Sequence, residues 1–219
     1  MRGKSWKTSS LFNMVDGIFA VAITLIPISI PNHFLESNEH DLLLLNASIV
    51  VIGLTMALMW HKLRSALKVS SPVNSIELAL VGIVCILAVM VPKCAFLAFK
   101  YGTAAADIWH WSLSQSVNIE YQGLIIIYEF IVLGLMASAL RKKSAAKYTK
   151  FQLSRFKAVE LVGLSLIAII VICENLSTSV NGVYLYFVPA VLLMEEVGYI
   201  WINKKSEGMG KRNQLSTVL

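Results

Sequence analysis

The stretch that decides the fold runs from Leu11 to Pro31 and reads LFNMVDGIFAVAITLIPISIP. It carries a single charge, Asp16, and it has about the 20 residues that a helix needs to cross a bilayer. An acid inside such a segment is costly unless it pairs or faces water, so we expect Asp16 to point at other helices or into a cavity. The small residues Gly17, Ala20 and Ala22 allow neighbouring helices to approach closely. The stretch therefore predicts a transmembrane helix that packs against protein.

Five further apolar runs follow along the chain. Together with the first, the expected spans are 11–31, 42–61, 76–99, 119–140, 158–174 and 182–202. Runs such as Leu124 to Ile127 are apolar on both faces, which excludes the alternating pattern of a membrane barrel. With 57% hydrophobic residues, 15% charged residues and a mean hydropathy of +0.69, the chain is too apolar for a water-soluble domain. We expect an all-α membrane protein in which residues 1–219 form a single domain of six transmembrane helices.

Lys and Arg residues are unevenly distributed among the segments that separate these runs. All but Lys93 and Lys100 of the 19 Lys and Arg residues fall into four clusters at alternate gaps. The clusters lie at 2–7, 62–68, 141–157 and 204–212. Cytoplasmic loops carry an excess of Lys and Arg, so both termini are predicted to be cytoplasmic. The net charge of +6 is explained by this bias and by attraction to anionic lipid, and we infer no nucleic-acid partner from it.

The sequence contains none of the familiar catalytic or ion-selective motifs. Patterns for zinc peptidases, serine hydrolases, P-loops and dinucleotide-binding turns are missing, and the three cysteines lack C-x-x-C spacing. A TVGYG-type carbonyl filter and an Arg-rich voltage-sensing helix are also missing. We therefore predict no enzymatic activity, no cofactor and no resident metal. Any ion conduction would depend on a selectivity and gating mechanism other than a carbonyl filter or a voltage-sensing helix.

Three stretches within the first hundred residues form a more specific pattern. Asp16 opens the sequence DGIFAVAITL, Trp60-His61-Lys62 closes the second run, and Asn74 precedes a third run that closes around Val91-Pro92. In order and spacing these stretches resemble the prokaryotic TMEM175-like potassium channels, which have a similar first helix, an aromatic-x-His exit from the second helix, and a third helix that opens with Asn and closes around Pro. The rest of the chain resembles that family only in hydropathy.

The resemblance implies a homotetramer in which the first helices of four subunits line a central pore for potassium ions. The constriction in that family is an apolar residue five positions after the Asp, which is Val21 here. The same helix face continues with Thr24, Leu25 and Ile28. A narrow apolar ring blocks ions by dewetting, and hydroxyl groups one turn away replace part of the hydration shell of a cation. Spacing alone favours packing of Val21, Leu25 and Ile28 within a helix bundle, and it is the family resemblance that favours a pore.

The chain departs from the family at the start of this helix. The Arg-x-x-x-Phe-Ser-Asp hallmark retains only Asp16. The other hallmark positions are occupied by Ser10, Met14 and Val15. In the family the acid belongs to a polar network at the cytoplasmic end of the pore helix, and the matching neighbours here are His61 and Asn74. Whether Lys7 supplies the missing cation stays open at this point.

Two other functions stay open as well. A small proton- or cation-coupled secondary transporter would use Asp16 or Glu129 as its ion site, and Glu129 lies in the middle of the fourth run with Lys93 at a comparable depth. Three further acids are nearer the run ends, where we expect structural roles, namely Glu160, Glu195 and Glu196. A non-conducting membrane scaffold would need no pore. The leading expectation is a potassium-preferring channel, multi-pass in the cell membrane, whose partners are potassium ions, the lipid bilayer and three further copies of the chain.

Overall fold

The computed structural model describes residues 8–28, 39–70, 73–101, 113–141, 150–176 and 184–216. Within these ranges the chain forms six α-helices, which are α1 (Thr8–Ile28), α2 (Glu39–Ser70), α3 (Ser75–Tyr101), α4 (Leu113–Arg141), α5 (Lys150–Leu176) and α6 (Tyr184–Ser216). Each helix contains a stretch that is long and apolar enough to cross a membrane. The prediction of an all-helical membrane protein with six spans is therefore confirmed.

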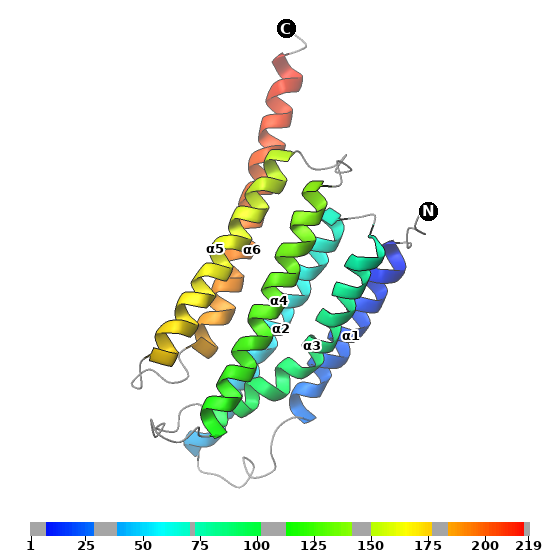
Figure 1. Ribbon diagram of the computed structural model, residues 1–219. Coiled ribbons are helices and arrows are strands. Elements are labelled where there is room, and N and C mark those ends of the chain that lie inside the picture. The colour runs from blue at the N-terminus through cyan, green and yellow to red at the C-terminus, as the bar shows by residue number, and fades with distance from the viewer. Residues whose placement is uncertain are drawn as a thin grey trace.

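Several helices extend well beyond the apolar runs that predicted them. The second run was expected to end at residue 61, but α2 continues to Ser70 and takes the second positive cluster into its last turns. Similarly, α6 continues to Ser216 and projects past the end of the bundle (Figure 1). Lys, Arg, Leu and Ala are good helix formers, so a helix continues past its apolar segment where such residues follow. The end of the first predicted run, residues 29–31, lies outside the described residues.

The central helix of the bundle is α2. It packs against α1, α3, α4 and α6, whereas α5 packs against α4 and α6. Among the described helices, α1 contacts only α2 and α3, so it lies at one edge of the bundle. The start of α1 and the end of α6 lie at the same end of the bundle, which is the upper end in Figure 1 and is called the terminal end. Whether this end faces the cytoplasm stays a prediction from the charge pattern.

Candidate functional site

The core of the bundle contains a lysine. Lys62 lies on the face of α2 that also carries Met59, Leu63 and Ala66, and all four side chains are completely buried. The sequence analysis counted Lys62 among the cytoplasmic charges that orient the protein, and the structure corrects this by placing it in the interior. Burying an ammonium group without ionic or hydrogen-bonding partners carries a large free-energy cost in a membrane protein. Lys62 therefore needs neighbouring side chains that compensate its charge.

Three glutamates from three different helices surround this lysine. The Nζ atom of Lys62 contacts Oε2 of Glu129 on α4 and Oε2 of Glu195 on α6. It also lies 3.0 Å from Oε2 of Glu160 on α5. The three carboxylates are buried, and each contributes an oxygen within 4.8 Å of the others. These four side chains form the ionic cluster, which joins α2 to the three helices of the C-terminal half of the chain.

Two tyrosines lie next to the ionic cluster. Tyr199 on α6 donates its hydroxyl hydrogen to Oε1 of Glu160, and its ring packs edge-on against Phe156 with 5.0 Å between ring centroids. Tyr128 on α4 donates to the backbone carbonyl of Met59 over 2.6 Å, which links α4 to α2 just before Lys62. Both tyrosine side chains are buried. The aromatic rings thus surround the charged groups with apolar surface and leave one hydroxyl in contact with a carboxylate.

The hydrogen bonds of the ionic cluster are incomplete when its carboxyl groups are treated as ionised acceptors. Among the described residues, neither Oε1 of Glu129 nor Oε1 of Glu195 has a hydrogen-bond partner. The one lysine faces three glutamates, so full ionisation would leave two uncompensated negative charges in the membrane interior. Such charge is strongly disfavoured there. The arrangement therefore suits the binding of protons or of an additional cation.

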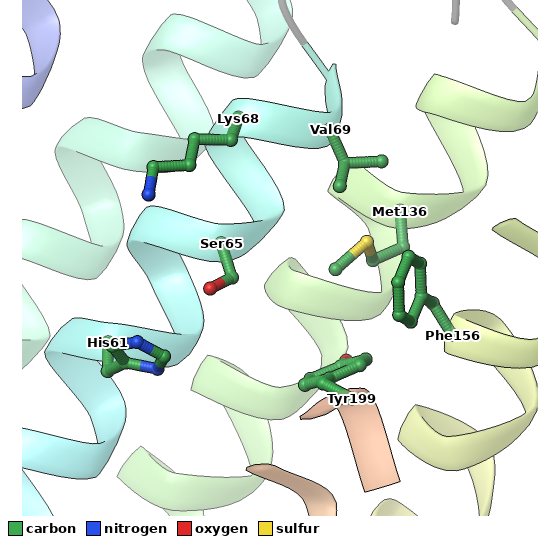
Figure 2. A pocket seen from close by; sticks show the side chains of 7 residues that line it. All are labelled: His61, Ser65, Lys68, Val69, Met136, Phe156 and Tyr199. Atoms are coloured by element: carbon green, nitrogen blue, oxygen red, sulfur yellow. The ribbon is translucent and has the colours of Figure 1, made fainter. Parts of the chain in front are cut away.

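A cavity of about 230 Å³ adjoins the ionic cluster on the side of the terminal end. Figure 2 shows that His61, Ser65 and Lys68 follow one another along α2, with Tyr199 and Phe156 on the other side of the cavity. Its lining is completed by Val69 and Met136. Tyr199 belongs both to the wall of this cavity and to the surroundings of Glu160. Tyr199 thus links this cavity to one of the buried carboxylates.

Asp16, the acid that the sequence singled out, lies between α1 and α2. The indole Nε1 of Trp60 donates a hydrogen bond of 2.7 Å to Oδ1 of Asp16. The guanidinium Nη1 of Arg64 is 3.7 Å from Oδ2, and this group also lies over the rings of Trp60 and Phe12. Arg64, one turn after Trp60, thus supplies a cation to Asp16. Lys7, for which that role was left open, lies outside the described residues.

The structure gives His61 and Asn74 partners other than Asp16. The Nδ1 atom of His61 is 2.8 Å from Oε1 of Glu196 on α6. Asn74 caps α3, because its Oδ1 accepts the backbone N–H of Glu77 while the Glu77 carboxylate accepts the backbone N–H of Asn74, both over 2.8 Å. Ser138 on α4 donates to the other oxygen of Glu77 over 2.5 Å. Within the described contacts of a single chain, Asp16, His61 and Asn74 thus belong to three separate sets of interactions.

The predicted pore-lining residues of α1 lie on the outer surface of the single bundle. The side chains of Val21, Thr24 and Ile28 are exposed, and Leu25 is half-buried. The hydroxyl of Thr24 donates to the backbone carbonyl of Val21 over 2.7 Å. Small and polar residues recur along the same exposed face at Ser10, Asn13, Gly17 and Ala20. This face of α1 is not covered by any described part of the chain.

Sequence reasoning identified only part of the ionic cluster. It named Glu129 but proposed Lys93 as its partner, whereas Lys62 makes that contact and the side chain of Lys93 is exposed. Glu160 and Glu195 were expected to have structural roles near the run ends, and both are buried against Lys62. A usable signal was present, because each of the last three apolar runs carries at least one glutamate. Nothing in the sequence paired those acids with a lysine of α2.

Comparison of the chain with protein-family models, curated proteins and solved structures finds no match.

Proposed function

We propose that this protein is a potassium-preferring cation channel of the cell membrane, assembled from four copies whose α1 helices line the conduction path. The observation that carries the proposal is the uncovered face of α1, at the edge of the bundle. A helix that met only lipid there would gain by presenting large aliphatic side chains. This face instead includes Asn13, Gly17, Ala20 and Thr24. Small residues favour close contact between helices, and polar ones favour contact with water or with another copy.

The positions named by the family resemblance fit this arrangement. Val21 is 54% exposed and stands next to the small residues, so a ring of Val21 side chains around a symmetry axis would form an apolar constriction. The hydroxyl hydrogen of Thr24 is used within the helix, which leaves the lone pairs of its oxygen available to a passing cation. A groove of about 420 Å³, lined by residues that include Asn13, Gly17, Val21 and Val89, provides room on the same surface for a side chain from another copy.

The test is potassium efflux from liposomes that contain the purified protein. Val21→Leu should reduce efflux, because four larger side chains narrow the ring. Val197→Leu on α6 is the matched control, since this valine is 58% exposed and does not lie on α1. Native mass spectrometry of the same preparations should show a tetramer. Equal efflux from Val21→Leu and the unaltered protein, or an equal loss in the control, would contradict the assignment of α1 as the pore helix.

The ionic cluster favours a second candidate, a proton- or cation-coupled secondary transporter. Buried carboxylates within a membrane protein commonly mark proton or ion pathways. In this case flux would saturate with substrate concentration and would require a proton gradient, and Glu129→Gln would abolish the coupling. A channel would instead pass potassium without a proton gradient. No flux under either condition would favour the non-conducting scaffold.

A further inference from the structure

We propose that the ionic cluster is a proton-binding site that exchanges protons with the terminal end of the bundle through the cavity beside Tyr199. The proposal rests on the contacts of Lys62, Glu129, Glu160 and Glu195, and it holds whether the protein is a channel or a transporter. The ligand is the proton, held as the acidic hydrogen of a carboxyl group. Three features of the cluster support this assignment: its net charge, its unpartnered carboxyl oxygens and its access route.

Bound protons would neutralise the net negative charge of the ionic cluster. One ammonium group and three carboxylates leave a net charge of −2, and these side chains are almost completely inaccessible to water. Two protons, each bound to a carboxylate oxygen, would make the cluster neutral. A divalent cation would also balance the charge, but the ammonium group of Lys62 already lies in contact with all three carboxylates and would repel it. Protonation of the carboxylates therefore balances the charge better than binding of a divalent cation would.

The hydrogen-bonding pattern agrees with the charge count. Oε1 of Glu129 and Oε1 of Glu195 are buried and have no partner within the described parts of the chain. An ionised carboxylate offers only acceptors, whereas a protonated carboxyl group also offers one O–H donor. Carboxylate oxygens of the three glutamates approach within 4.8 Å of one another, so small side-chain rotations would bring such a donor to a neighbouring oxygen. Added protons would thus give the unpartnered oxygens hydrogen bonds and would also neutralise the charge.

Tyr199 provides the route by which these protons would enter and leave. It lines the cavity that also contains His61, Ser65 and Lys68, and its hydroxyl donates to Oε1 of Glu160. A hydroxyl group can accept a hydrogen bond from water while it donates its own hydrogen, so it can relay a proton from the cavity to the carboxylate without moving its ring. The positions of the lining residues are shown in Figure 2.

Other titratable groups near the route come from α2, α4 and α6. On α2, His61 and Lys68 line the cavity, and the imidazole of His61 lies 2.8 Å from the carboxylate of Glu196 on α6. On α4, Tyr128 stands next to Glu129 but donates to a backbone carbonyl. The contact between His61 and Glu196 places an imidazole and a carboxylate beside the cavity that Tyr199 also lines. Lys68 is exposed and remains solvated.

The experiment is infrared spectroscopy of the full-length protein in liposomes, following the absorption band of protonated carboxyl groups while the buffer pH is changed. The band should be present near neutral pH and should decrease as the pH rises. If two protons are shared, Glu129→Gln should reduce the band by about half, because the net charge to be balanced falls from −2 to −1. Lys62→Met should increase the band by about half, because three carboxylates would then need three protons.

Two further variants separate the proposal from general damage to the fold. Tyr199→Phe keeps the ring that packs against Phe156 and should leave the size of the band unchanged, while the band responds more slowly to a pH jump. Glu77→Gln is the matched control, since Glu77 is also a buried glutamate but accepts hydrogen bonds at the start of α3. This control should not change the band.

Three results would overturn the proposal. A band that Glu129→Gln does not reduce would show that the cluster is not protonated. A band that is insensitive to buffer pH would show that its protons do not exchange. A divalent metal that remains bound in stoichiometric amount after purification with chelator, and is lost in Glu129→Gln, would show that a metal ion rather than protons balances the charge.

Discussion

At the scale of single residues, the position of Glu195 depends on a glycine. A side-chain carbon added to Gly163 on α5 would overlap the carboxyl group of Glu195 on α6. Glycine within a helix normally costs up to about 1 kcal/mol relative to alanine. Its presence at residue 163 is therefore explained by the space that the carboxyl group of Glu195 requires.

This explanation predicts opposite effects for two similar substitutions. Gly163→Ala should destabilise the protein by about 1–3 kcal/mol, because the new methyl group must displace a carboxyl group that contacts Lys62. Gly134→Ala on α4 is the control, since a Cβ atom there would meet nothing within 4 Å. It should be neutral or slightly stabilising. The measurement is the midpoint of thermal aggregation in detergent, and equal midpoints for the two variants would show that Glu195 relocates without cost.

At the scale of helices, polar interactions of Asp16 join α1 to α2 near the terminal end. Asp16 receives a hydrogen bond from Trp60 and faces the guanidinium group of Arg64. Asp16 and Arg64 are each about one-third exposed, so their ion pair is worth less than a buried one. The apolar side chains Val15, Phe19 and Ala22 bury the remaining contact surface of α1. Docking of α1 thus depends on both kinds of contact.

Graded substitutions of Asp16 should separate these contributions. Asp16→Asn retains an oxygen that can accept the hydrogen bond from Trp60 and loses only the ion pair, so we expect a loss of stability below about 1 kcal/mol. Asp16→Ala loses both interactions and should cost about 1–3 kcal/mol. Asn13→Ala, on the exposed face of the same helix, is the control and should change stability little. The same detergent assay reports all three, and a normal midpoint for Asp16→Ala would show that the acid contributes nothing to docking.

At the scale of the whole molecule, α1 begins and α6 ends at the same end of the bundle, and the charge pattern predicts that this end faces the cytoplasm. A native reporter is available at the opposite end. Cys173 is an exposed free cysteine at the end of the α5 span, whereas Cys85 and Cys94 are buried. The orientation can therefore be tested without introducing new cysteines.

A membrane-impermeant maleimide should label Cys173 in intact cells and should not label it in inside-out vesicles before the membrane is permeabilised. Cys173→Ser is the control and should abolish labelling, because the other two cysteines are buried. The measurement is the shift in mass of the purified protein. Labelling in inside-out vesicles but not in intact cells would place both termini outside and would reverse the orientation inferred from the Lys and Arg clusters.

The sequence alone determined the fold class, because crossing a membrane imposes requirements that are local. Each span must be about 20 residues long and predominantly apolar, and both properties can be read within one segment. The run that begins at Leu11 and the five that follow it met these requirements, and all six became helices. The helix ends were predicted less well, because polar residues that follow an apolar run, such as Lys62 to Lys68, continue a helix as readily as they form a loop.

Only the tertiary structure decided which charges meet. By sequence, Lys62 was grouped with the cytoplasmic charges Arg64 and Lys68, and Glu160 and Glu195 were expected to have structural roles because they lie near run ends. Their true environment depends on how far α2 extends and on which helices pack around it, and both are non-local properties. Likewise, the partner of Asp16 proved to be Arg64, which is distant in sequence and close only after α1 and α2 pack. Local composition sets whether a segment enters the membrane, whereas pairing inside the membrane is set by the packing of all the helices.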